Sequence, residues 1–263
     1  RRAADDLPHT LRDDAVDGAA WDVDLRIDVP PAPHHAIEPR CAVAEFGALG
    51  SPGTTGAPAT AGASGQAAML QVWAGSQDAF YVRDVLARHT GLGPDRVVVH
   101  AQRIGGGFGG RTICTVELEA ALLAMSAATG GRPVKVQWTR AQELRQAFHR
   151  PPSSHRVRAR LDGGRLVAWS HDFATTPILL TNAALPEWLH PVTRLTGDNG
   201  AARGAALPYR VPAQRIAYAL ARLPLYTGPW RGLGAGPNSL AMESAIDECA
   251  RAAGRDPLAF RLD

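Results

Sequence analysis

The chain has 263 residues, 45% of them hydrophobic and 20% charged, which is the composition of an ordinary globular protein with one or two domains. Lys and Arg number 28 against 25 Asp and Glu, and no run of about five basic residues occurs, so nucleic acid is not an expected partner. No apolar run reaches the length of about eighteen residues that a transmembrane helix needs. The three cysteines are widely separated, so we expect free, buried thiols rather than a disulfide framework or a CxxC metal site.

The first part of the chain predicts little regular structure. Residues 1–46 form an N-terminal segment, in which the polar residues 1–20 are expected to be a surface strap or a frayed end. Residues 21–29 alternate as in a strand, and the prolines that follow should end it. Residues 47–68 are rich in Gly, Ala, Ser, Thr and Pro, so we expect a flexible surface loop there.

Residues 69–263 are expected to form the main domain. Its first half predicts these elements: a strand at 69–74, a helix at 77–91, a strand at 96–103, a helix at 115–131 and a strand at 133–138. A loop with five glycines lies between the second strand and the second helix. This order of strands and helices favours an α+β (mixed α/β) fold.

The second half predicts a hairpin and a long helix. Thr139 should cap a short helix at 140–147, and two alternating segments flank the turn Asp162-Gly163-Gly164. Residues 174–210 look irregular, and a strand is expected at 211–220. The final elements are a helix from Asn238, as its cap, to Gly254, with Met242, Ile246 and Cys249 on its apolar face, and a helix restarted by Asp256-Pro257.

The glycine loop, RIGGGFGGR at 103–111, matches two nucleotide-binding patterns imperfectly. Gly105 to Gly110 fits G-x-G-x-x-G, but the next strand ends in Trp138-Thr139-Arg140, without the acidic residue of a dinucleotide fold. Gly105 to Thr112 resembles a phosphate-binding P-loop, but Arg111 replaces the lysine. A nucleotide-binding protein that uses the GGGFGGRT loop is therefore an alternative function.

The number of glycines points to a ligand. A tight turn needs one or two residues with positive φ, and each further glycine costs backbone entropy on folding. Close approach of backbone N–H groups to an anionic or electron-rich ligand explains the excess better. Phe108, within the loop, suits the wall of a small-molecule pocket.

Four separated motifs resemble the molybdopterin-binding large subunit of the xanthine dehydrogenase and aldehyde oxidase family, most closely its isoquinoline 1-oxidoreductase branch. They are VPPAPHHAIEPRCAVAEF (29–46), VWAGSQ with GLGPDRVVVHAQRIGGGFGGR (72–111), PVKVQWTRAQEL (133–144) and TGPWRGLGAGPNSLAMESAIDECARAAGRDPLAFR (227–261). The resemblance implies that residues 69–263 are the first molybdopterin-binding domain of such a subunit.

The resemblance also implies the cofactor-binding residues. Gln77 would direct its amide toward the metal, although it could instead cap the following helix. The metal and the pterin would be contacted by the loop residues Gly106, Gly107, Phe108 and Gly109. Arg231 with Gly232 would form another wall of the metal site. The alternative for Arg231 is a surface ion pair. Phe108 and Trp230 are the expected substrate-pocket residues, although Trp230 fits a core position equally. His34, His35 and Glu38 would make packing and interdomain contacts.

The family's reaction is hydroxylation of an N-heteroaromatic or aldehyde carbon, with water as the oxygen source. The implied cofactor is molybdenum-molybdopterin, in bacteria usually the cytosine dinucleotide form, with no protein side chain on the metal. Electrons would pass to 2Fe-2S clusters, for which three scattered cysteines do not suffice, so a partner iron-sulfur subunit is implied.

Two positions depart from the family pattern. Thr112 stands where the purine-oxidising branch has a glutamate, which counts against a purine substrate. The family's catalytic glutamate belongs to a Gly-x-Gly-Glu motif in a C-terminal molybdopterin domain, and residues 1–263 contain no such motif. We therefore expect these residues to be inactive alone. A noncatalytic or degenerate cofactor-binding module is the other alternative.

Overall fold

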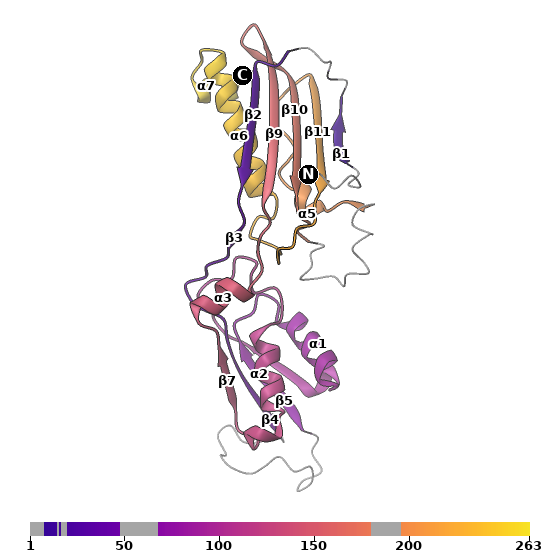
Figure 1. Cartoon of the computed structure of the whole chain (residues 1–263), viewed down its shortest axis with the longest axis vertical. Coiled ribbons are helices and arrows are strands. Elements are labelled where there is room, and N and C mark those ends of the chain that lie inside the picture. The colour runs from indigo at the N-terminus through magenta and orange to yellow at the C-terminus, as the bar shows by residue number, and fades with distance from the viewer. Residues whose placement is uncertain (1–7, 15, 17–19, 48–67, 180–195) are drawn as a thin grey trace. The chain divides into compact units, whose positions relative to one another are not determined.

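The computed structural model describes residues 8–14, 16, 20–47, 68–179 and 196–263. The chain divides into two compact units, each containing its own sheet (Figure 1). Residues 34–147 form what we call the glycine-loop unit, and residues 1–33 with 148–263 form the long-sheet unit. The main domain expected at 69–263 therefore has parts in both units.

The long-sheet unit contains a five-stranded sheet in the order β1-β11-β10-β9-β2. Its strands are β1 (His9–Asp13), β2 (Val23–Val29), β9 (Ser153–Asp162), β10 (Arg165–Thr175) and β11 (Ala213–Leu220). Neighbours are antiparallel except β10 and β11, which are parallel. The other elements are the short paired strands β3 (Ala32–Pro33) and β8 (His149–Arg150), and the helices α5 (Asn199–Ala202), α6 (Ala235–Ala252) and α7 (Pro257–Leu262).

The expected hairpin is confirmed in β9 and β10. Gly163 and Gly164 form its two-residue turn with φ of 54° and 75°, the combination that matches the twist of the flanking strands. Residues alternate along β9, so that His155 and Val157 are buried while Arg156 lies on the opposite, solvent-facing side. One face of the sheet therefore carries the core of this unit.

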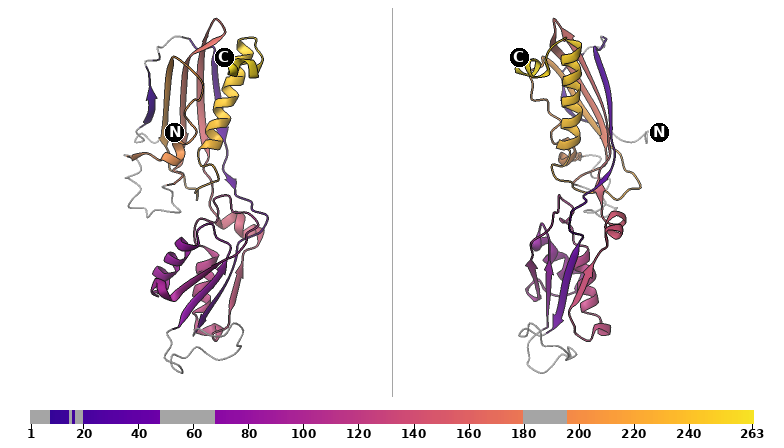
Figure 2. Two further views of the ribbon diagram at one scale, coloured as in Figure 1. Left: turned by 180° about the vertical axis from the view of Figure 1, so that it is seen from behind. Right: turned by 90° about the vertical axis from the view of Figure 1, so that its left-hand side faces the viewer.

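Helix α6 covers that face and packs against β2 and β9 (Figure 2). Met242, Ile246 and Cys249 are buried there, as their spacing predicts. The predicted cap is wrong, because the helix begins three residues before Asn238 and is capped by Gly234. The Asn238 amide is buried and donates hydrogen bonds of 2.9 Å to the carbonyl oxygens of Ala201 and Arg203.

Part of the N-terminal segment forms a strand that was not predicted. Residues 9–13, predicted as part of a strap or frayed end, form β1 and pair with β11, because that strand offers a free edge. The loop expected at 47–68 lies outside the described residues apart from its two end positions, and the irregular stretch at 174–210 is described only in part. The helix restarted by Asp256-Pro257 is confirmed at 257–262, and the Asp256 side chain caps it.

The glycine-loop unit contains a four-stranded sheet in the order β6-β5-β4-β7. Its strands are β4 (Cys41–Gly47), β5 (Met69–Ala74), β6 (Val97–Ala101) and β7 (Val134–Gln137), and its helices are α1 (Ala79–Thr90), α2 (Val116–Ala124) and α3 (Arg140–Gln146), with 3-10 turns η1 (Pro94–Arg96) and η2 (Ala127–Thr129). The predicted mixed α/β fold is confirmed. Strand β4 was not predicted, and it joins β5 to β7 in the middle of the sheet.

Helix α1 connects the parallel strands β5 and β6 and ends at Gly91 with φ of 72°, as its sequence predicts. Helix α2 is shorter than the predicted 115–131, because the chain tightens into η2 after Ser126. Thr139 caps α3 through a capping box with Gln142, which agrees with the prediction. The glycine loop lies between β6 and α2 and leads into the N-terminus of that helix.

Candidate functional site

The glycine loop is a compact turn with three residues in the left-handed region. The φ angles are 106° at Gly106, 53° at Phe108 and 96° at Gly109. For a phenylalanine this conformation costs roughly 1–2 kcal/mol, so the surrounding structure must hold it. The Phe108 ring lies over Gly106, where an added Cβ would be 2.8 Å from the ring, and 39% of Phe108 stays exposed.

Gln77, at the entrance to α1, is bound to this loop. Its Oε1 accepts hydrogen bonds from the backbone N–H groups of Gly109, at 3.0 Å, and Arg111, at 3.2 Å. Its own backbone N–H donates to the Arg111 carbonyl oxygen at 3.0 Å. Because N–H groups require an oxygen acceptor, these contacts fix which end of the amide faces the loop.

The other end of that amide is an available donor. Gln77 is exposed, and its Nε2 has no hydrogen-bond partner in the described part of the chain. The alternative role as a helix cap is wrong, since the Asp78 side chain accepts from the Tyr81 N–H and caps α1.

Gly107 makes room for the glutamine. A Cβ at this position would lie 2.5 Å from Gln77 Oε1, so the end of the glutamine side chain would have to move away from the loop. Gly107 is therefore required by contact with Gln77 and not by an unusual φ. The sequence motif VWAGSQ and the glycine loop, which are separated by about 30 positions, thus form one structure.

The backbone of the loop also presents free donors. The N–H groups of Gly106, Gly107 and Phe108 make no hydrogen bond within the described residues. Gly107 is buried against the Gln77 amide and Gly106 lies under the Phe108 ring, so these neutral donors and Gln77 Nε2 form one cluster. Such a cluster suits an anionic or electron-rich ligand with an apolar part.

Buried charges lie beneath the loop. Arg40 and Arg111 are 3% and 4% exposed, and the residues Glu117 and Glu143 are 4% and 8% exposed. Burial lowers the pKa of Arg40, an effect opposed by Glu143, and burial raises the pKa of Glu117.

Glu38, expected to make packing and interdomain contacts, packs directly against Gly105 at the start of the loop, and its interdomain contacts stay a prediction. Its Oε2 accepts the Gly105 N–H at 2.7 Å.

The predicted residues Trp230, Arg231 and Gly232 belong to the long-sheet unit, in the turn that precedes α6. The Leu233 N–H donates to the Trp230 carbonyl oxygen at 2.7 Å, and Gly232 and Leu233 have φ of 88° and 57°. Arg231 is exposed and makes no ion pair or hydrogen bond within the described residues, so the alternative of a surface ion pair is not observed. Its guanidinium group is available for a ligand.

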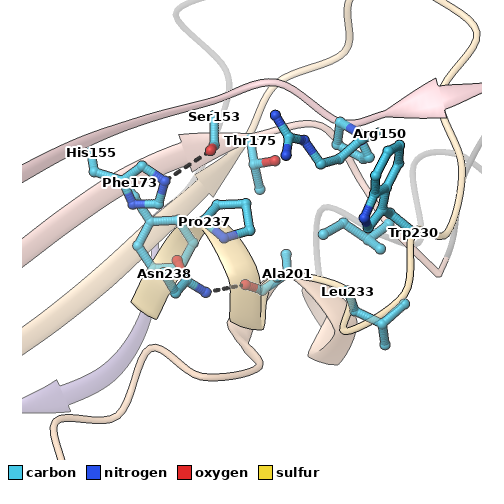
Figure 3. Close-up of a pocket in the computed structure, with 13 residues that line it drawn as sticks. Arg150, Ser153, His155, Phe173, Thr175, Ala201, Trp230, Leu233, Pro237 and Asn238 are labelled. Carbon is cyan, nitrogen blue, oxygen red and sulfur yellow. Dashed lines mark hydrogen bonds between the residues drawn. The ribbon is translucent and has the colours of Figure 1, made fainter. Parts of the chain in front are cut away.

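Trp230 lines a small pocket of the long-sheet unit (Figure 3). The Arg150 guanidinium lies 5.4 Å from the centre of its ring, a cation–π contact. Ser153 and His155 share a 2.8 Å hydrogen bond in the same pocket, and His155 Nδ1 lies 3.1 Å from His171 Nε2. Trp230 is thus a pocket wall, and its contact with substrate stays a prediction.

The described residues contain no group of His, Cys, Asp and Glu side chains arranged to hold a metal ion. Their helices include none with the length and apolar character to cross a membrane. Cys41, Cys114 and Cys249 are free thiols, of which only Cys249 is fully buried, and burial raises the pKa values of Cys114 and Cys249 to about 12.

Residues 58–263 match the family of molybdopterin cofactor-binding domains. The chain is 29% identical over 194 residues to isoquinoline 1-oxidoreductase subunit beta of Brevundimonas diminuta, covering 73% of this chain and 24% of the relative. It is 28% identical over 252 residues to the aldehyde oxidoreductase molybdenum-binding subunit PaoC of Escherichia coli K12, covering 95% of this chain and 30% of the relative.

The structure resembles aldehyde oxidoreductase from Desulfovibrio gigas with a TM-score of 0.67 and 26% identity, over 97% of this chain and 25% of that one. The chain therefore spans only about a quarter to a third of the length of each of these proteins.

Proposed function

Because the chain belongs to the family of molybdopterin cofactor-binding domains, we propose that its glycine loop holds a molybdenum-molybdopterin cofactor, in the cytosine dinucleotide form, within a larger oxidoreductase. That enzyme hydroxylates a carbon of an N-heteroaromatic ring or an aldehyde, with water as the oxygen source. It passes the electrons to 2Fe-2S clusters of a partner subunit. The names of the relatives, an isoquinoline oxidoreductase subunit and aldehyde oxidoreductases, support this class of substrate.

The observation that carries the proposal is the cluster of unpartnered donors. The N–H groups of Gly106, Gly107 and Phe108, together with Gln77 Nε2, offer hydrogen bonds to the oxygen and sulfur atoms of such a cofactor. None of these donors carries a formal charge, so they stabilise an acceptor without neutralising it. The residues present therefore fit the group.

The chain's own residues bind and orient. Gln77 donates from Nε2 while its Oε1 keeps the loop in place, and the Phe108 ring forms an apolar wall. In the long-sheet unit, Arg231 carries a permanently charged planar group suited to a substrate dipole, and Trp230 lines a pocket of that unit. When bound, the molybdenum cofactor supplies the two-electron oxidation of the substrate carbon.

The proposed enzyme needs parts that these residues do not provide. The general base is a glutamate of a further molybdopterin domain, and the clusters belong to an iron-sulfur subunit. A noncatalytic cofactor-binding module would share the donor cluster but would not turn over substrate when assembled with these parts.

The substitution Gln77→Glu tests the proposal. A glutamate keeps an oxygen for the Gly109 and Arg111 N–H groups but replaces the outward donor by a negative oxygen. We expect the molybdenum and pterin content of the assembled enzyme to fall by about tenfold or more, since loss of a partner of a metal site usually has that effect. Gln102→Glu is the matched control, because within the described residues the side chain of that exposed glutamine donates a hydrogen bond only to the neighbouring His100 carbonyl oxygen. Unchanged cofactor content in Gln77→Glu would refute the role of the glutamine.

A further inference from the structure

Two residues on either side of Pro39 hold opposite ends of the glycine loop. We infer that Glu38 and Arg40 form a clamp that fixes the loop in its binding conformation before the cofactor arrives. The two side chains are positioning residues, because Glu38 contacts Gly105 and Arg111 and Arg40 contacts Gly110, and they act on a ligand through the loop. The ligand in this inference rests on the proposed function, whereas the clamp itself rests on contacts within the glycine-loop unit.

Glu38 holds the beginning of the loop through three atoms. Its carboxylate Oε2 accepts the Gly105 N–H at 2.7 Å, and its backbone N–H donates to the Gly105 carbonyl oxygen at 3.3 Å. A Cβ at Gly105 would lie 2.5 Å from the Glu38 Cβ, so the two backbones meet in direct contact. The loop can approach Glu38 in this way only because position 105 is glycine.

Arg40 holds the end of the loop. One terminal nitrogen of its guanidinium donates to the Gly110 carbonyl oxygen, and the other donates to Thr115 Oγ1 at 3.1 Å. Thr115 is the residue that precedes helix α2, so the same side chain ties the loop to the helix. The charge of Arg40 is balanced by Glu143, whose Oε1 lies 3.5 Å from Arg40 Nε.

Arg111, which follows Gly110 in the chain, links Glu38 to the segment that carries Gln77. Its guanidinium donates to the Glu38 carbonyl oxygen at 2.6 Å and lies 3.4 Å from Glu38 Oε2. It also donates to the Gly75 carbonyl oxygen at 3.4 Å, and a Cβ at Gly75 would lie 2.8 Å from it. Arg111, which replaces the lysine of the P-loop pattern, therefore points inward and supports the segment that carries Gln77.

Such a clamp is physically useful because of the five glycines. Glycine loses more backbone freedom on ordering than any other residue. If the glycine loop became ordered only when the ligand bound, the lost backbone entropy would be a cost that lowers ligand affinity. Contacts at both ends transfer that cost to folding. The N–H groups of Gly106, Gly107 and Phe108, which make no hydrogen bond within the described residues, are then already held in place when the ligand binds.

Amide hydrogen exchange on the full protein, isolated without and with its cofactor, tests the clamp. Glu38→Ala removes the acceptor of the Gly105 N–H, so we expect the amides of Gly105, Gly109 and Arg111 to exchange about tenfold faster, as loss of a supporting hydrogen bond implies. Glu38→Gln keeps an acceptor oxygen and should largely restore protection. Glu45→Ala, in strand β4, is the control, since the Glu45 side chain makes no hydrogen bond or ion pair within the described residues.

Retention of molybdenum during dialysis and the electron paramagnetic resonance signal of Mo(V) are measured on the same variants. Faster exchange in Glu38→Ala, rescued by Glu38→Gln and accompanied by faster loss of molybdenum, supports the inference. Exchange equal to that of Glu45→Ala overturns the clamp. Faster exchange with unchanged molybdenum retention and an unchanged Mo(V) signal leaves the clamp standing and overturns the loop's proposed function.

A second variant covers the case in which Glu38→Ala does not fold. Arg40→Lys keeps the buried positive charge beside Glu143 but cannot reach both Gly110 and Thr115 with a planar fork. The same rise in exchange is expected at the end of the loop, with the exposed Arg145→Lys as the control. Unchanged exchange in Arg40→Lys contradicts the role of Arg40.

Discussion

Gly107→Ala is predicted to disconnect Gln77 from the glycine loop. The added methyl group would lie 2.5 Å from Gln77 Oε1 and 2.8 Å from the carbon of the same amide, so the side chain must move away. It then loses the hydrogen bonds from the Gly109 and Arg111 N–H groups. At about 1 kcal/mol for each hydrogen bond, the loop loses roughly 2 kcal/mol of local stability.

The expected result is faster amide exchange at Gly109 and Arg111, by more than about tenfold, together with a lower molybdenum content of the assembled enzyme. Exchange is measured by mass spectrometry on peptides that cover residues 104–114. Gly47→Ala is the matched control, because a Cβ at this position of the same unit meets no atom of the described residues within 4 Å. Its exchange and its molybdenum content should equal those of the wild type.

The reasoning would be refuted if Gly107→Ala retained wild-type exchange at both amides. In that case Gln77 and the loop would not share the contacts described above. A normal exchange rate with reduced molybdenum would also contradict it, since the loss would then act directly on the ligand and not through Gln77.

Two further predictions concern the long-sheet unit. Burial lowers the pKa of His155 to about 4 and of His171 to about 3, with Asp28 and Asp172 acting in the opposite direction, so both histidines stay neutral in the folded state. The contribution of the neutral histidines to the free energy of unfolding is therefore complete above pH 6.5 and is lost as the pH falls toward 4, by up to roughly 3 kcal/mol for His155. Urea denaturation at pH 7.5 and pH 5 measures this loss. An equal free energy of unfolding at the two pH values would contradict the prediction. Arg231→Lys should change the free energy of unfolding by less than about 0.5 kcal/mol, because Arg231 makes no ion pair or hydrogen bond within the described residues. Turnover by the assembled enzyme should fall about tenfold in Arg231→Lys, because lysine lacks the planar guanidinium group. Unchanged turnover would show that this group does not contact substrate.

Local patterns were sufficient to predict most of the elements. Alternating polar and apolar residues predict β9 and β10, and the Gly163-Gly164 pair predicts their turn. Apolar residues at helical spacing predict α6. The start of α6 was misplaced because Asn238 is a typical cap residue, whereas its amide is used in the core to hold the Ala201 and Arg203 carbonyl groups. Strand β1 was missed because its order comes from pairing with β11, about 200 residues later in the sequence.

In the candidate site, too, local motifs could be predicted from the sequence and long-range contacts could not. The glycine loop and Gln77 are visible in the sequence as motifs, although their mutual contact is not. Glu38 and Arg40 were not recognised as support for the loop, because their partners lie about 70 positions away and no local period relates them. The available signal was two charged residues placed directly before the apolar strand β4, where buried charge requires a specific partner.

The central claim is that the glycine loop holds a molybdopterin cofactor, and the metal and pterin content of the protein tests it most directly. The protein is isolated with the subunits with which it assembles, and molybdenum, pterin and nucleotide are quantified in the same sample. We predict equimolar molybdenum and pterin, both reduced in Gln77→Glu and Gly107→Ala but not in the control Gly47→Ala. Bound adenine nucleotide without molybdenum or pterin would contradict the account and would favour a nucleotide-binding loop.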